Sequence, residues 1–219
     1  MAESHVSPHP ALAHHFENLE QQREAGTLGM WVFLVTEIMF FGGMFLAYLV
    51  YRSAFPRMFA EASSQLDLTL GAVNTVVLIC SSFTMALAVF GAQVGNRRML
   101  VFFLLLTILL GLAFLGIKSL EYRHKFEHHL FPGSHFRYQG SNAREAQIFF
   151  GLYFAMTGMH ALHMIIGVGL LSVLAWMAKR GRFSPEYFSP VELSGLYWHF
   201  VDIIWIFLFP LLYLIGRHP

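Results

Sequence analysis

The stretch LGMWVFLVTEIMFFGGMFLAYLV, residues 28–50, decides the fold, and Glu37 is its only charged side chain. At a rise of about 1.5 Å per residue, a helix of this length crosses the hydrocarbon core of a bilayer. Glu37 would then lie roughly 13 Å inside it, near the middle, where a charge costs at least ~2.5 kcal/mol. The stretch therefore predicts a transmembrane helix whose carboxyl group has a polar partner on another span.

Similar apolar stretches recur along the chain. The chain has 219 residues, is 56% hydrophobic and is 12% charged, which is about half the charged fraction usual in soluble domains. Apolar runs of this length satisfy their backbone hydrogen bonds in lipid as helices. We therefore expect an all-α integral membrane bundle of five transmembrane helices, at residues 28–51, 68–92, 99–117, 148–178 and 193–216.

The N-terminal region has a different composition. Residues 1–27 are polar, and they lack the basic-then-apolar order of a cleavable signal. We expect a largely disordered soluble arm there, followed by a transmembrane domain at 28–219. A lone cysteine, Cys80, excludes an intrachain disulfide and argues against a thiolate metal site. The near-neutral net charge of +1 gives no reason to expect nucleic acid as a partner.

Basic residues give weak information on orientation. The densest basic sites are Arg97–Arg98 and the cluster at 179–182, both in connections on the same side as the N-terminus. The positive-inside rule favours a cytoplasmic N-terminus and an external C-terminus, although the total number of Lys and Arg residues does not.

Polar residues lie within the first span and just after the third. Glu37 is either a protonated carboxyl that bonds a neighbouring helix, or a functional carboxyl linked to proton movement or lipid. The adjacent Gly42 and Gly43 should let another helix approach closely. After the third span, we expect Lys118 to snorkel toward the interface and to anchor the helix end together with Glu121.

The last two spans carry imidazoles and a second deep carboxyl. His160 and His163 share one helical face, and His199 and Asp202 lie one turn apart, which makes them plausible mutual partners. Three interpretations remain open for His160 and His163: hydrogen bonds between helices, a role linked to lipid headgroups or protons, and a metal or haem site. A bis-histidine haem needs an opposing histidine, and only His199 is intramembrane elsewhere.

A histidine-rich segment lies in the longest predicted connection. His124, His128 and His129 resemble one box of a membrane di-iron desaturase. That chemistry needs several such boxes, and no others are present. We expect a solvated or partner-contacting loop with no metal, and a membrane di-iron enzyme is the remote alternative.

Four blocks of sequence resemble subunit III of haem-copper respiratory oxidases (cytochrome c oxidase). They occur in the family's order on four spans, and the resemblance covers nearly everything after residue 27. Longer members of this family have seven helices, and this chain is similar to their last five, as are the short bacterial forms. The blocks are TEIMFFGGMFLA at 36–47, LGIKSLEY at 115–122, TGMHALHMIIG at 157–167 and YWHFVDIIWIFLF at 197–209.

The resemblance implies a non-catalytic accessory subunit of a proton-pumping terminal oxidase in the bacterial inner membrane, with a cytoplasmic N-terminus and a periplasmic C-terminus. It implies that haem and copper belong to subunits I and II, that this chain packs on subunit I and binds structural phospholipid, and that it supports proton uptake and complex stability in aerobic electron transport. Cytochrome c is the implied electron donor, and a respiratory supercomplex is a further implied partner. The matching intramembrane polar residues are Glu37, Glu121, His160, His163, His199 and Asp202.

Two related functions share most of these motifs. They are subunit III of a quinol oxidase and the similar subunit found beside nitric oxide reductases. A free-standing transporter is less consistent with the sequence, because five spans with no evident internal repeat are not typical of transporters.

Overall fold

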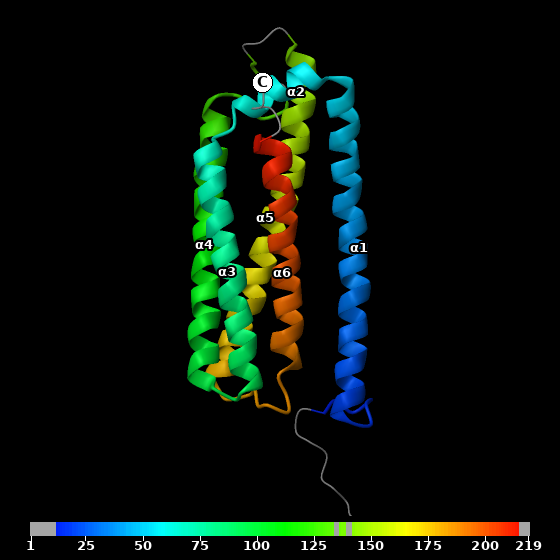
Figure 1. Ribbon diagram of the computed structural model, residues 1–219, viewed down its shortest axis with the longest axis vertical. Helices are drawn as coiled ribbons and strands as arrows, with labels where there is room; N and C mark the ends of the chain where they lie inside the picture. The colour runs from blue at the N-terminus through cyan, green and yellow to red at the C-terminus, as the bar shows by residue number, and fades with distance from the viewer. Residues whose placement is uncertain (1–11, 134–135, 139–141, 215–219) are drawn as a thin grey trace, which may run out of the picture.

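The computed structural model describes residues 12–133, 136–138 and 142–214, which form one elongated bundle of helices (Figure 1). Five of these helices are long and apolar enough to cross a membrane. This confirms the predicted all-α fold with five candidate transmembrane helices. The long helices are α1 (Leu19–Ala54), α3 (Leu68–Gln93), α4 (Arg97–Glu127), α5 (Ala143–Lys179) and α6 (Ser189–Phe209), and the short ones are α2 (Pro56–Ser64) and the π-helical turn η1 (Pro210–Leu214).

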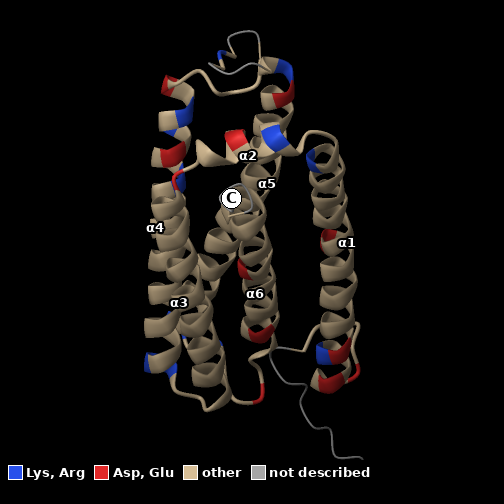
Figure 2. Ribbon diagram, turned by 45° about the horizontal axis from the view of Figure 1, so that its top comes forward, with Lys and Arg blue, Asp and Glu red and all other residues tan. Residues whose placement is uncertain are grey.

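The long helices run alternately up and down the bundle. The start of α1, the α3–α4 turn and the α5–α6 connection lie at one end, which we call the N-terminal end (Figure 1). Helix α2, the α4–α5 connection and η1 lie at the other, the C-terminal end. Charged residues gather at both ends, and the middle of the bundle is almost free of them (Figure 2). A multi-pass membrane protein has this distribution, because charges are costly in the hydrocarbon core.

Helix α1 begins well before the apolar stretch. The Asn18 side chain caps it by accepting a hydrogen bond from the Gln21 backbone N–H at 2.8 Å, and Glu20 lies in its first turn. Both features stabilise a helix N-terminus. In residues 19–27 the predicted disordered arm is therefore helical instead, while residues 1–11 lie outside the described part of the chain.

Helix α4 extends well beyond its predicted end. It continues to Glu127, so Lys118 lies within the helix and not at its terminus. The Lys118 side chain points into the bundle and is 3% exposed. The predicted snorkelling is therefore wrong, because a buried acid in the next turn of the same helix holds the ammonium group. The connection to α5 is correspondingly shorter than expected and begins at His128.

The core is built around α6, with Trp198 at its centre. The indole is fully buried and donates from Nε1 to Ser81 Oγ at 2.9 Å. A Cβ atom added at Gly111 would lie 2.7 Å from this ring, and one added at Gly167 would lie 2.9 Å from it. These two glycines therefore allow α4 and α5 to close on the indole.

Helix α1 is packed more loosely than the others. Its buried residues are Leu34, Phe41 and Tyr48, a single stripe at a spacing of one heptad. It packs mainly on α5 and α6, and the Tyr48 hydroxyl donates to the Leu211 carbonyl at 2.7 Å. Apart from the backbone of α1 itself, no atom of the described residues lies within 4 Å of a Cβ added at Gly42 or Gly43. The described part of the chain therefore does not make the close helix approach expected there.

Candidate intramembrane polar site

Glu37 on α1 faces His163 on α5, which confirms that the deep carboxyl has a polar partner on another span. His163 Nε2 lies 3.1 Å from Glu37 Oε2. The other ring nitrogen, Nδ1, lies 2.8 Å from the Met159 carbonyl oxygen. A carbonyl oxygen only accepts, so Nδ1 carries a proton. The contact between Nε2 and the carboxyl then needs one further proton, held on either side. The contact therefore requires one proton shared between the carboxyl of α1 and the imidazole of α5.

The Glu37–His163 pair lies at the edge of the bundle. The Glu37 side chain is 20% exposed and that of His163 is 10% exposed. The Phe41 ring packs against the imidazole with centroids 5.3 Å apart, and the Tyr197 hydroxyl donates to the His163 carbonyl at 2.9 Å. Aromatic packing fixes the imidazole, while the carboxyl remains partly accessible from outside this chain.

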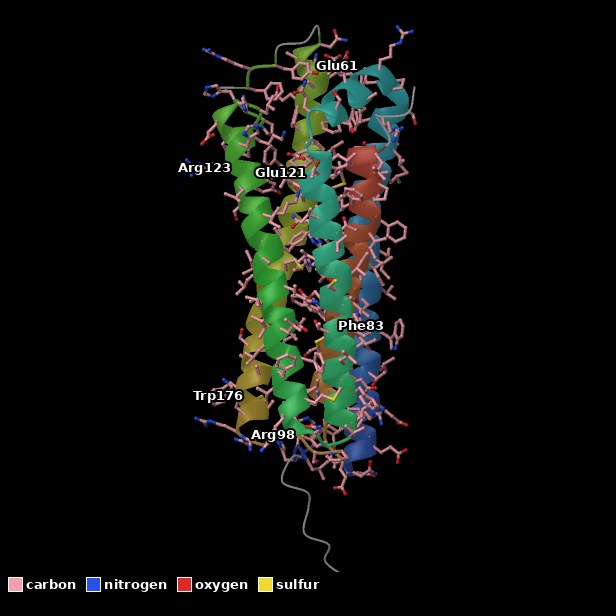
Figure 3. The ribbon with its side chains drawn as sticks, turned by 60° about the vertical axis from the view of Figure 1, so that its left-hand side comes forward. Glu61, Phe83, Arg98, Glu121, Arg123 and Trp176 are labelled. Atoms are coloured by element: carbon pink, nitrogen blue, oxygen red, sulfur yellow. The ribbon has the colours of Figure 1, made fainter. Side chains whose placement is uncertain are left out.

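A second polar cluster, Lys118–Glu121–Tyr153–Tyr213, lies toward the C-terminal end, and Figure 3 shows its labelled member Glu121 within the bundle. Lys118 Nζ lies 2.9 Å from Glu121 Oε2 and 2.8 Å from the Tyr213 hydroxyl. The hydroxyls of Tyr153 and Tyr213 both donate to Glu121 Oε1. The ammonium also lies 4.6 Å from the centroid of the Trp205 ring, a cation–π contact. These interactions neutralise both buried charges within the chain.

His160 is one turn from His163 but has different surroundings. It is 1% exposed, and neither ring nitrogen has a hydrogen-bond partner among the described residues. Its ring packs against Phe114 and Trp205, with centroids 5.3 Å away in each case. Among the described residues, no group of three or more His, Cys, Asp or Glu side chains is arranged to hold a metal ion. The two histidines therefore contact different groups, although they lie one turn apart.

The predicted pairing of His199 with Asp202 is wrong. His199 Nδ1 instead contacts Ser82 Oγ on α3 at 2.6 Å. Asp202 is 2% exposed, and neither of its oxygens has a hydrogen-bond partner in the described part of the chain. One turn of spacing places the two side chains on one face of α6, but the imidazole turns toward the neighbouring helix.

The histidine-rich segment borders a polar hollow of about 650 Å³ at the C-terminal end. Two of its rings, His124 and His128, contact each other with centroids 4.4 Å apart. Across the hollow, the Tyr138 hydroxyl donates to the Glu61 carboxylate at 3.0 Å. Partial burial and this carboxylate raise the pKa of Tyr138 to about 12, so the phenol remains a neutral donor. The segment forms a polar surface that includes the end of α4.

Two residues of the polar cluster were not anticipated from the sequence. Tyr153 lies one turn from Thr157 and two turns from His160 on α5, so its place on the polar face was readable from helical spacing. Tyr213 follows Pro210 in the π-helical turn, where the helical periodicity changes. No pattern in the sequence indicated that its hydroxyl meets Lys118.

These features define a multi-pass α-helical membrane protein that pairs most of its intramembrane polar groups internally. The family model for cytochrome c oxidase subunit III matches residues 13–217, nearly the whole chain. The chain therefore belongs to this family and is an accessory subunit III of a haem-copper oxidase, as the resemblance predicted.

Some relatives of this chain are named cytochrome c oxidase subunit 3, and others are named quinol oxidase subunit 3. Cytochrome c oxidase subunit 3 of Thermostichus vulcanus is 33% identical over 191 residues, which cover 87% of each chain. Quinol oxidase subunit 3 of Bacillus subtilis is 31% identical over 203 residues, covering 90% of this chain and 92% of the relative. Cytochrome c oxidase subunit 3 of Alkalihalophilus pseudofirmus is 28% identical over 214 residues, covering 96% and 97% respectively.

Proposed function

We propose that this chain packs on subunit I of a proton-pumping terminal oxidase, where it supports proton uptake and the working life of the complex. Haem and copper belong to the partner subunits in this proposal. The observation that carries it is the Glu37–His163 pair, which holds one proton near the middle of the first span. A carboxyl–imidazole pair that is partly exposed at the edge of the bundle is suited to a role in proton supply to a neighbouring subunit.

The position of the pair supports a contact with another subunit. Helix α1 buries only one stripe against this chain, and the apolar residues on its other faces, such as Ile38 and Met39, are largely exposed. The glycines Gly42 and Gly43 follow on the same helix, and no other described segment lies within 4 Å of a Cβ added at either one. Small residues favour close helix approach in membranes. This face is therefore suited to a helix of subunit I.

We propose cytochrome c as the electron donor of the complex. The cytochrome c oxidase relatives support this proposal. The quinol oxidase of Bacillus subtilis has similar identity and coverage, so quinol is the second candidate donor. The neighbouring subunit II distinguishes them, since a copper-binding domain in that subunit is needed to accept electrons from cytochrome c.

We further propose bound phospholipid and a cytoplasmic location for the N-terminal end, in the bacterial inner membrane. A hollow of about 500 Å³ at this end is lined by Arg97, Arg98 and Lys179 together with apolar side chains of α4. Basic residues beside an apolar surface are suited to an anionic headgroup and its acyl chains. The same basic residues favour a cytoplasmic location.

Purification of the complex through a tag on this chain tests the proposal. We expect subunits I and II to copurify, with a haem spectrum and copper in those subunits. Separation of the subunits, followed by metal analysis, should find the iron in subunit I. Stoichiometric iron in this chain alone, or its purification without oxidase subunits, would contradict the proposal.

A further inference from the structure

A groove of about 340 Å³ lies between α3 and α6, away from the Glu37–His163 pair. Its walls are apolar, and its rim residues Ile79, Phe83, Ile203 and Ile206 are 45–65% exposed. Figure 3 shows the Phe83 ring pointing away from the bundle. Only three polar side chains line the groove: Ser82, His199 and Asp202.

Asp202 at this groove is deeply buried yet incompletely hydrogen-bonded. Neither oxygen has a partner among the described residues that meets normal hydrogen-bond geometry. The neighbouring hydroxyl, Ser82, contacts His199 Nδ1 at 2.6 Å, and its single proton supplies at most one hydrogen bond to Asp202. A carboxyl group offers several acceptor positions, so one shared hydroxyl leaves most of them unused. An unused polar group in hydrocarbon is costly, and a further donor is needed.

The depth of Asp202 restricts where such a donor can come from. At about 1.5 Å per residue, Asp202 lies roughly 20 Å along α6 from Ser189, in the middle of the span. Lipid headgroups lie at the ends of the span, and acyl chains carry no donor. A side chain from another transmembrane helix meets the requirement, because polar side chains commonly bond across helices in membranes.

We propose that the α3–α6 groove receives a transmembrane helix of a neighbouring oxidase subunit, which places a hydrogen-bond donor against Asp202. The surface beside the groove is long enough for a helix. Exposed apolar residues continue along α3 on both sides of the groove, from Val76 to Phe90, a rise of roughly 20 Å. This inference rests on the proposed function, since it assumes assembly with the oxidase, and it identifies a second contact surface separate from α1.

A photo-crosslinking amino acid at position 83 tests the location of the partner in the intact complex. Phe102 on α4 is the matched control position, because it is 61% exposed and Phe83 is 65% exposed. We expect a crosslink from position 83 to a transmembrane segment of another subunit, in at least severalfold higher yield than from position 102. Adducts with lipid or with a small hydrophobic molecule only, or no adduct at position 83, would overturn the inference. Such a result would leave the proposed function intact, provided that the unmodified chain copurifies with the oxidase.

Substitution of Asp202 tests whether this residue accepts a hydrogen bond from the partner helix. Asp202→Leu removes the acceptor, whereas Asp202→Asn keeps one acceptor oxygen at the same place. We expect Asp202→Leu to lower retention of this chain in the complex during detergent washing by on the order of fivefold, and Asp202→Asn to lower it less. Leu109→Ile is the control, because this residue is 62% exposed on α4 and does not line the groove, and it should leave retention unchanged. Equal retention of the Leu and Asn variants would contradict a partner donor that bonds to Asp202. If the Leu variant fails to assemble, the crosslink from position 83 remains an independent test.

Discussion

The Lys118–Glu121–Tyr153–Tyr213 cluster and the α3–α6 groove each bury one acid to the same extent, since Glu121 and Asp202 are both 2% exposed. Glu121 receives an ammonium group and two phenol hydroxyls from its own chain. Among the described residues, Asp202 has neither a cation nor a well-formed hydrogen bond. The two acids are equally buried but differently paired, which indicates that they have different roles. The cluster joins helices α4, α5 and η1. Asp202 at the groove, by contrast, lacks a hydrogen-bond donor that another subunit can supply.

Lys118→Met should give the largest effect. It leaves Glu121 charged and buried without its cation, and breaking a buried ion pair in this way costs about 3–5 kcal/mol. The measurement is the unfolding free energy of this chain within the detergent-solubilised complex. Arg123→Met on the same helix is the control, because the Arg123–Glu127 pair is exposed on both sides and should contribute below about 1 kcal/mol. Similar losses of unfolding free energy for the two variants would mean that the cluster does not hold the helices together.

The double variant Lys118→Met, Glu121→Leu sharpens this result. It removes both charges, and apolar replacements of buried ion pairs are often neutral or stabilising. We therefore expect the double variant to be more stable than Lys118→Met in the same unfolding measurement. A double variant as unstable as the single one would show that the loss comes from packing and not from an unpaired charge.

Gly111→Ala should have the next largest effect. The new Cβ would lie 2.7 Å from the Trp198 ring, and overpacking of this kind costs about 1–3 kcal/mol. Gly42→Ala is the comparison, since no other described segment of this chain lies within 4 Å of its added Cβ. Thermal unfolding of the two variants compares the closed core with the open face of α1. In the complex, destabilisation by Gly42→Ala would indicate a neighbouring helix at that face.

Glu37→Gln should have the smallest effect on assembly and initial rate. The amide keeps the shape of the side chain and removes its carboxyl group, and the proposed function assigns oxygen reduction to another subunit. We expect a normal amount of this chain in the complex and an initial rate of oxygen consumption close to the unmodified value. A large fall in the initial rate, with assembly intact, would contradict a non-catalytic role for this residue.

The sequence predicted much of the fold and only part of the polar contacts. The apolar stretches located all five long helices, because the cost of charge in hydrocarbon limits the sequence strongly. The same rule predicts an end of α4 that is too early, because it assigns Lys118 to the membrane interface. No sequence pattern indicates that Lys118 pairs with two tyrosines from distant segments. Spacing within α6 likewise did not predict that His199 contacts Ser82 on α3 and not Asp202 on its own helix. Glu37 was easier to interpret, because a lone deep carboxyl requires a partner from another helix.

The most direct measurement of the central claim is the number of turnovers that the oxidase completes before it loses activity, with and without this chain. We predict that the complex lacking the chain starts at a near-normal rate, then takes up protons more slowly or inactivates after far fewer turnovers. An unchanged initial rate together with an unchanged total number of turnovers would contradict the account.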